Sequence, residues 1–311
     1  MTALPRLVHV GSVVVDIVMH VPAFPERGGD VLATRSEITP GGGLNVMVSA
    51  RRQGCPVAYA GLCGTGPFGD MTRKELENNG IELLQGTYEG ADTGYDVALV
   101  DPAGERSFAT SLGAESRLDT EHLERIEIFP GDVVYVSGYG LIAQHNGPAL
   151  AGWLPKVDPL ARVIVDPGPL VADIADEVLR PVYQRADWWS CNQREATLST
   201  GIQAPVEAAV ALAGETGRAG VIVRTGPAGR GCVLVEAGRP PLLVPGNRVS
   251  TVDTNGAGDA HVGAFVAGLL AGLGSYEAVR RANAVAALAV TRYGPATAPA
   301  AAEVDAFLAG I

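Results

Sequence analysis

A polar, glycine-rich stretch that runs directly into an apolar segment is the part of this sequence best suited to chemistry. It covers residues 252–259, VDTNGAGD, and AHVGAF follows it. The small residues Gly256, Ala257 and Gly258 leave backbone N–H groups uncovered at a predicted helix start, at the positive end of the helix dipole. Such amides bind a phosphate or a developing anion. Asp259 adds a carboxylate, and phosphoryl transfer needs both groups because a weak base must accept the proton of the attacking hydroxyl.

A longer match separates this interpretation from an ordinary helix start, in which Asp259 would be only an acidic first-turn residue. DTNGAGD followed by HVGAF resembles the second signature of the ribokinase-type (PfkB) sugar kinases, usually DTTGAGD-x-F-x-G-A. The resemblance implies that Asp259 is the catalytic base. It also implies that the amides of Gly256, Ala257 and Gly258 neutralise charge on the transferred phosphoryl group. Since a helix N-terminus stabilises a carboxylate, we expect Asp259 to stay ionised and to be a modest base.

The resemblance extends over nearly the whole chain and sets an expectation for fold and activity. It implies one ribokinase-like kinase domain over residues 1–311, built as a three-layer α/β/α sandwich with a mostly parallel central sheet and a small β lid. The implied activity is transfer of the γ-phosphoryl group of ATP, with Mg²⁺, to a hydroxymethyl group of a small sugar such as ribose or fructose. A nucleoside kinase of the same fold and a non-catalytic sugar-binding regulator are the alternatives.

The composition excludes several other classes of protein. A chain of 311 residues that is 47% hydrophobic can bury the core of a large α/β domain. A net charge of −11 argues against nucleic acid or an anionic membrane as a partner. Lys74 and Lys156 are the only lysines, and neither lies in a GxxxxGK[ST] motif, which excludes a Walker A loop. The four cysteines lack metal-ligand spacing and no signal peptide or membrane span is evident, so we expect a cytoplasmic protein.

The first predicted strand ends in a candidate substrate ligand. Residues 7–15 are largely β-branched and apolar, which predicts one buried strand with Asp16 at its end. On its own, Asp16 could equally be a turn or capping residue. The family resemblance implies that Asp16 binds sugar hydroxyls.

Three consecutive glycines precede the first predicted helix, which ends at Gly54. They either form a flexible turn or offer backbone amides to a ligand. The sequence GGGLN resembles the first signature of the same kinase family, with a spacing one residue shorter if Gly41 is its first glycine. The resemblance implies sugar contacts by Gly42, Gly43 and Asn45, and it leaves open which glycine touches the substrate.

Two segments have the alternating polarity of half-exposed strands. Residues 30–39 form one, and residues 93–111 form a hairpin around the turn DPAGE. These strands could extend the main sheet. The resemblance instead implies a β lid over the sugar, which in relatives often pairs between subunits, so a homodimer is expected. An exposed sheet with an apolar face needs such a cover.

Residues 64–69 contain Gly-x-Gly-x-x-Gly after a predicted strand and before a predicted helix, as in the dinucleotide fingerprint. A strand and a helix precede this loop, whereas the fingerprint normally follows the first strand of its domain. Pro67 also stiffens it. The kinase family has Gly-x-Asp-x-x-Gly at this point, with Gly66 in place of the aspartate. We therefore favour the kinase over an NAD-binding protein.

The remaining candidates concern the nucleotide and its ions. The resemblance implies Mg²⁺ binding through water at Glu195, within an Asn-x-x-Glu motif, and oxygen ligands with retained waters suit that ion. It implies a monovalent cation, K⁺, at Asp253 and the loop 291–297, although Asn255 replaces the usual hydroxyl residue of the motif. Nucleotide contacts are implied for Asn192, Thr225, Gly226, Gly229 and Asn283.

Overall fold

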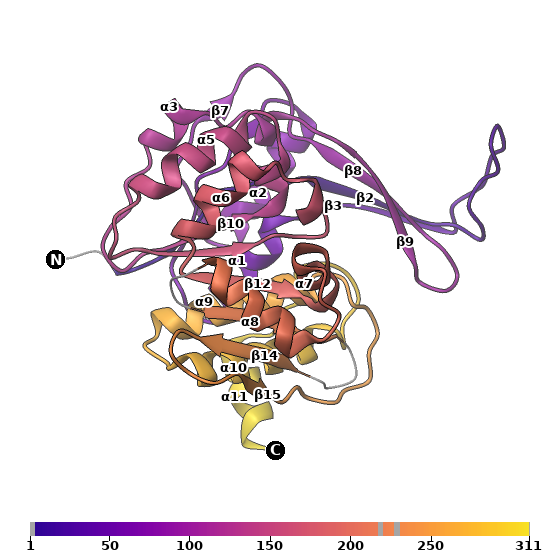
Figure 1. Ribbon diagram of the computed structural model, residues 1–311. Coiled ribbons are helices and arrows are strands. Elements are labelled where there is room, and N and C mark those ends of the chain that lie inside the picture. Colours follow the sequence, from indigo (N-terminus) through magenta and orange to yellow (C-terminus); the bar gives the residue numbers. More distant parts are fainter. Residues whose placement is uncertain (1–3, 217–219, 227–230, 311) are drawn as a thin grey trace.

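The computed structural model describes residues 4–216, 220–226 and 231–310 of the chain. Within these residues the larger sheet has nine strands in the order β15-β14-β13-β12-β11-β10-β1-β4-β6. Neighbouring strands are parallel throughout β13-β12-β11-β10-β1-β4-β6. At the other edge, β14 and β15 pair antiparallel. Helices pack on both faces, which gives the three-layer sandwich expected from the sequence (Figure 1). The strands are β1 Leu7–His9, β4 Val57–Tyr59, β6 Glu82–Leu83, β10 Val133–Ser137, β11 Arg162–Asp166, β12 Trp188–Asn192, β13 Gly220–Arg224, β14 Cys232–Glu236 and β15 Leu242–Val244.

Two hydrophobic clusters, one on each face of the sheet, form the core. The first packs against α1 Gly43–Arg52, α2 Pro67–Asn78, α9 Ala257–Leu270, α10 Ser275–Ala289 and α11 Ala301–Ala309. The second packs against α3 Thr120–Glu124, α4 Gly138–Ile142, α5 Asn146–Trp153, α6 Asp176–Arg185, α7 Gln193–Thr200 and α8 Pro205–Thr216. The central strands are continuous apolar runs because both of their faces are buried. Several end in a polar residue, and parallel strands bring those residues to one edge, where ligands bind in folds of this type.

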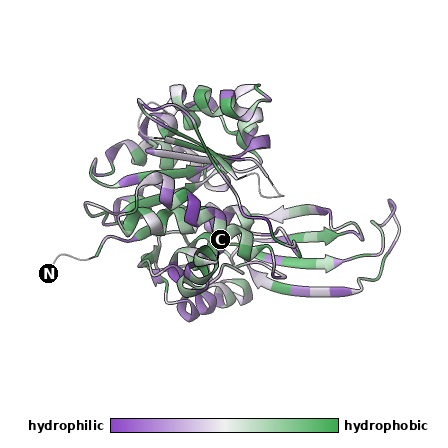
Figure 2. Cartoon of the chain, turned by 90° about the horizontal axis from the view of Figure 1, so that it is seen from below, coloured by the Kyte–Doolittle hydropathy of each residue, from purple (hydrophilic) through white to green (hydrophobic). Residues whose placement is uncertain are grey.

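A second sheet of four strands projects from the body (Figures 1 and 2). Its order is β3-β2-β8-β9, with β2 Val15–His20, β3 Arg35–Pro40, β8 Tyr95–Val100 and β9 Arg106–Ser111. The inner strands β2 and β8 are more hydrophobic than the edge strands (Figure 2). This small sheet is separate from the nine-stranded sheet, so its strands do not extend it. A two-stranded pair, β5 Cys63–Gly64 and β7 Thr87–Tyr88, precedes the small sheet's hairpin.

The prediction of one strand over residues 7–15 is wrong. The chain leaves the central sheet after β1 and enters the small sheet at Val15, so Asp16 lies on β2. The pattern changes little at the break. Only Gly11 and Ser12 interrupt the apolar residues, and residues 13–15 are again buried or half-buried. Similarly, β3 begins at Arg35, five residues after the strand predicted from Asp30.

The glycine loop at 64–69 is closed by the chain itself. The carboxylate of Asp92 accepts hydrogen bonds from the amides of Phe68 and Gly69, at 3.1 and 2.7 Å. A Cβ at Gly66 would lie 2.7 Å from the same carboxyl group. Asp92 therefore occupies the helix N-terminus that a dinucleotide phosphate would need, which argues against the NAD alternative.

The four cysteines are all buried and free. Across the described ranges, no helix combines the length and apolar character needed to cross a bilayer.

Candidate functional site

The turn over residues 252–258, which leads into α9 and is called the anion turn below, has the geometry of an anion site. Gly256 is the N-cap, with a left-handed φ of 69° that favours glycine. The helix begins at Ala257, so the predicted amides lie in its first turn and Asp259 is its third residue. The Ala257 amide donates to the Thr254 carbonyl at 3.3 Å, a long bond that a phosphate oxygen can replace.

Asp259 lies where the turn meets the first glycine motif. Its Oδ2 accepts a hydrogen bond of 3.0 Å from Nδ2 of Asn45, on α1. Burial raises the pKa of Asp259 to about 7, and the charges of Asp166 and Glu195 add to this against the opposing Asn45 bond and Arg224. Burial thus acts against the expectation that the helix N-terminus keeps this carboxyl ionised, because desolvation is the largest effect on its pKa. A base with a pKa near neutrality is well matched to proton abstraction.

A pair of carboxyls lies on the inner strands of the small sheet. Asp16 on β2 is directly opposite Asp96 on β8. Burial, followed by the charge of Asp96, raises the pKa of Asp16 to about 8, and burial also raises the pKa of Asp96. The charge of Asp259 adds a smaller contribution to the shift at Asp16. Two carboxyls that cannot both ionise easily are good partners for sugar hydroxyls, since each can donate or accept.

The glycines of the first motif have three different environments. A Cβ at Gly41 would lie 2.2 Å from Oδ2 of Asp16. Gly42 has a φ of 59°, in the left-handed region. A Cβ at Gly43 would lie 1.8 Å from Nε2 of the buried His9. Gly41 is thus the glycine adjacent to Asp16, the candidate sugar ligand, and Gly43 faces the core. The sequence favoured Gly42 and Gly43 as the contacts instead.

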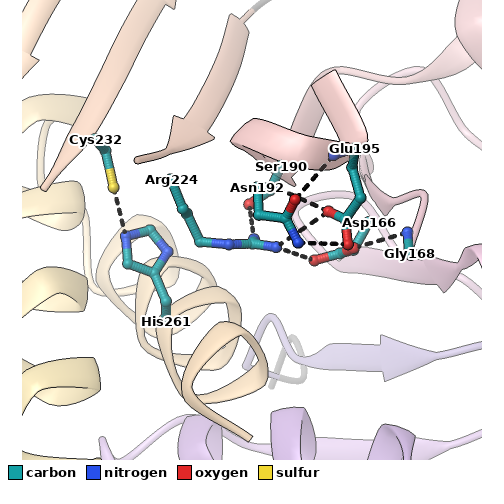
Figure 3. Close-up of polar contacts among 8 residues, drawn as sticks. All are labelled: Asp166, Gly168, Ser190, Asn192, Glu195, Arg224, Cys232 and His261. Carbon is teal, nitrogen blue, oxygen red and sulfur yellow. Dashed lines mark hydrogen bonds and ion pairs between the residues drawn. The ribbon is translucent and has the colours of Figure 1, made fainter. Parts of the chain in front are cut away.

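A cleft of about 540 Å³ opens on the other side of the turn. That volume suits a nucleotide-sized ligand. The cleft brings together the described nucleotide candidates other than Thr225, and it includes Ala257 and Gly258 of the anion turn. Its wall also contains His261, whose pKa burial lowers to about 3, so the imidazole is neutral. His261 Nε2 lies 3.3 Å from the Cys232 sulfur (Figure 3).

Arg224, at the end of β13, is the cation of this cleft. Its Nη1 donates to Ser190 Oγ at 2.7 Å, and its Nη2 donates to Asp166 Oδ2 at 2.9 Å and lies 3.8 Å from Glu195 (Figure 3). Burial acts to lower the pKa of Arg224, but the charges of Asp166 and Glu195 outweigh it and raise the pKa. A Cβ at Gly258 would lie 3.5 Å from Nη2, so the guanidinium faces the anion turn.

Asn192 and Glu195 form a capping box at the start of α7. The Asn192 side chain accepts from the Glu195 amide at 2.9 Å, and Glu195 Oε2 accepts from the Asn192 amide at 2.7 Å. The Asn192 amide group donates to Glu195 Oε1 at 2.7 Å. The pair therefore has a structural role of its own. Asn192 also lines the cleft, and Glu195 lies behind it, beside Asp166 and Arg224 (Figure 3). Asp166 closes a local turn, since its Oδ1 accepts from the Gly168 amide at 3.1 Å, and its Oδ2 accepts from Arg224.

Of the other nucleotide candidates, Gly226 and Asn283 line the cleft, and Thr225 lies next to it in the chain. Thr225 closes its loop through Oγ1, which donates to the Gly231 carbonyl at 2.9 Å, and Gly226 has a φ of 94°. Asn283 donates to the carbonyls of Val244 and Pro245 at 3.3 and 3.1 Å. Gly229 lies outside the described residues.

Asp253, the candidate ligand of a monovalent cation, has three hydrogen-bond donors. Its Oδ1 accepts from the Asn255 amide at 2.9 Å and from Nη2 of Arg106 at 2.7 Å, and its Oδ2 accepts from the Gly294 amide at 3.2 Å. Burial acts to raise the pKa of Asp253, but these bonds hold it below the ordinary value. Arg106 comes from β9 of the small sheet.

Sequence analysis missed three residues of this site: Asp96, Arg106 and Tyr139. The first two lie in an alternating hairpin, where polar residues are normally just the solvated face. Tyr139 follows β10 and is 51% exposed. A Cβ at Gly168 would lie 3.9 Å from its Cε2 atom, so the ring lies beside the turn that follows β11. A signal was available for Tyr139 alone, because it directly follows a strand whose carboxyl end faces the site.

Known proteins resemble this chain in both sequence and structure. Residues 4–301 match the family model described as pfkB family carbohydrate kinase. An uncharacterized sugar kinase of Escherichia coli, YegV, is 33% identical over 294 residues, which cover 93% of this chain and 90% of that protein. The ribokinase of Haemophilus influenzae is 29% identical over 292 residues, covering 91% and 92%. The crystal structure of ribokinase from Thermotoga maritima superimposes with a TM-score of 0.81 at 27% identity, covering 98% and 99% of the two chains.

The family model and the relatives span the elements that carry the site, from β1 to the helices after the anion turn. Asp259 and both glycine motifs lie inside the matched region. On this ground the chain belongs to the pfkB family of carbohydrate kinases.

Proposed function

We propose that this kinase transfers the γ-phosphoryl group of ATP to a hydroxymethyl group of a small, uncharged sugar. The observation that carries the proposal is the position of Asp259. It is in the first turn of α9, beside the anion turn, and contacts Asn45 at 3.0 Å on the side of the acceptor carboxyls. A hydroxyl held there would have a base on one side and a phosphate site on the other, as in-line transfer requires.

The side of the site that would bind the phosphoryl acceptor, lined by carboxyl groups, favours a neutral substrate. A sugar acid or a sugar phosphate would be repelled by any of Asp16, Asp96 and Asp259 that is ionised, and it would hinder the ionisation of Asp259 as a base. Hydroxyl groups can bind these carboxyls in either protonation state. The Oδ1 atom of Asn45, buried and without a partner among the described residues, offers one more acceptor. A coupled assay for ADP release over neutral sugars, sugar acids, sugar phosphates and nucleosides tests the proposal. Turnover confined to charged sugars, or no turnover with any acceptor, would contradict it.

A nucleoside acceptor is the second candidate, and Tyr139 is the observation that favours it. This exposed aromatic ring lies just after β10, at the carboxyl edge of the parallel sheet, and can stack on a base. The same assay separates the two, because a nucleoside kinase would turn over nucleosides faster than the free sugars.

The donor set of the cleft fits MgATP. Asp166 and Glu195 present carboxylate oxygens and Arg224 a fixed positive charge, and both carboxylates are already hydrogen-bonded. Mg²⁺ keeps several waters, so these residues would hold it through water while the phosphates supply direct ligands. When bound, the ion neutralises phosphate charge. Arg224 and the turn amides then orient the phosphoryl group toward the acceptor.

We propose further that the small sheet is a lid over the sugar and the contact surface of a homodimer. Its edge strands carry exposed Ile38 and Phe108, at 52% and 59%, and Leu112 directly follows at 61%. Edge strands with exposed apolar residues need cover. The proposed location is the cytoplasm. Light scattering on the purified protein tests the dimer.

Asp16→Ala is expected to weaken sugar affinity by about 1–3 kcal/mol, the usual cost of leaving buried polar partners unpaired. ATP affinity should change little, because Asp16 lies on the small sheet and not in the nucleotide cleft. Isothermal titration with each ligand measures both effects. Unchanged sugar affinity would return Asp16 to a structural role.

The matched variant Asp16→Asn keeps the shape of the side chain and separates charge from packing. The folded-state pKa of Asp16, about 8, lies above that of an unfolded chain, so the folded protein binds more protons between about pH 4 and 8. The free energy of unfolding therefore falls as pH rises through this window, because Asp16 ionises in the unfolded chain while it stays protonated in the folded protein. Asp16→Asn should lack that loss, and thermal unfolding at two pH values measures it.

A further inference from the structure

The outer end of the small sheet contacts the C-terminal half of the chain. One row across this sheet contains Arg35, His20 and Arg106, since His20 pairs with Arg35 and with Val100, and Val100 pairs with Arg106. His20 Nε2 lies 2.6 Å from the Tyr293 hydroxyl, and the Arg35 guanidinium stacks 4.2 Å from the centre of the same ring. The Arg106 contact with Asp253 belongs to this row.

Arg106 and Asp253 form the part of this contact that reaches the phosphate site. The ion pair is 2.7 Å long, with side chains that are 21% and 6% exposed. Screening by solvent is weak at such a site, so the charge of the guanidinium acts strongly on the carboxylate. Through Oδ1 the carboxylate also holds the Asn255 amide, one residue before the N-cap of α9. A displaced Asp253 would therefore move the turn that aims the amides of Gly256 and Gly258.

We propose that Arg106 is a positioning residue that sets the anion turn from the small sheet, and that its guanidinium takes the place of a monovalent metal ion at Asp253. This inference rests on the proposed kinase function. The charge that holds the turn belongs to the same small sheet that carries Asp16 and Asp96. The position of this sheet and the conformation of the anion turn are therefore coupled. A potassium ion at the same oxygen would repel the guanidinium, so the K⁺ dependence expected from the sequence stays a competing prediction.

The test compares wild type, Arg106→Met and Arg106→Lys in KCl, NaCl and tetramethylammonium chloride at equal ionic strength. Wild-type turnover should be the same in all three salts. Arg106→Met should lower kcat by up to about 100-fold, the cost of misplacing a catalytic group by about 1 Å, with a smaller change in the KM for sugar. Added guanidinium at low concentration should restore part of that turnover, and Arg106→Lys should retain more of it than Arg106→Met.

Arg27→Met is the matched control, since Arg27 is an exposed arginine between β2 and β3, and it should behave as wild type. K⁺-stimulated turnover of the wild type would overturn the inference. So would an Arg106→Met variant within two-fold of wild type, or one whose loss is equal in kcat and sugar affinity and is not rescued. If Arg106→Met fails to fold, Arg106→Lys decides, because a wild-type fold with no K⁺ effect and reduced kcat supports the role and unchanged kcat overturns it. An inactive wild type would contradict the kinase proposal itself.

Discussion

Asp259→Asn is expected to lower kcat by about 10²–10⁴-fold, the usual contribution of a positioned base, while the affinities for ATP and sugar stay within a few-fold. The amide cannot accept the proton of the attacking hydroxyl. It keeps the shape of the side chain and can still accept the hydrogen bond from Asn45. Because the proton is transferred only as the transition state forms, the loss should appear in turnover and not in binding. Steady-state kinetics and titration with each substrate measure the two effects.

The pH dependence of the wild type adds a second readout. Burial raises the pKa of Asp259 to about 7, so kcat/KM of the wild type should fall as pH decreases through about 7, where the base becomes protonated. Asp259→Asn should lack this limb. The control is Asp70→Asn, an exposed aspartate on α2, which should preserve both rate and profile. Near-wild-type turnover in Asp259→Asn would remove Asp259 from the role of base.

Arg224→Met should lose both stability and turnover. The change leaves the buried carboxylates of Asp166 and Glu195 without their cation, and breaking a buried pair in this way costs about 3–5 kcal/mol. It also removes the charge that faces Gly258 and the anion turn, so ATP affinity and kcat should fall. Urea unfolding, titration with ATP and kinetics measure these three quantities.

A double variant separates the two effects of Arg224. Arg224→Met combined with Asp166→Asn removes one of the unpaired charges, so it should regain part of the stability lost in the single variant. It should regain none of the turnover, because the cation is still missing. An unfolding free energy within about 1 kcal/mol of wild type in Arg224→Met would mean that the cation contributes little net stability.

The sequence contained enough to predict the three-layer fold and the turn at 252–259, because both depend on local patterns. Short stretches of sequence are enough to predict continuous apolar strands and a glycine-rich helix start. The break between β1 and β2 was not predicted, because only Gly11 and Ser12 separate the β-branched residues on its two sides. Its cause is the pairing of β2 with β8, some 80 residues further along the chain.

Long-range contacts also explain the errors at the site. The choice against a dinucleotide site at 64–69 was correct, but the contact that closes the loop comes from Asp92, more than 20 residues away in the chain. Asp96 and Arg106 looked like ordinary solvated residues of a hairpin, because their partners Asp16 and Asp253 come from distant segments. The protonation of Asp259 depends on burial, which no local pattern reports.

The three glycines at 41–43 differ in how they could tolerate change. Gly42 is restricted by its own backbone, so no replacement elsewhere relieves it. Gly41 is restricted by the carboxyl of Asp16, and making room there would remove the proposed sugar ligand. Gly43 is restricted by the imidazole of His9, a core side chain outside the proposed chemistry. Alanine at Gly43 is therefore the only one of the three replacements that a second-site suppressor, a smaller residue at His9, could accommodate while leaving the reaction intact.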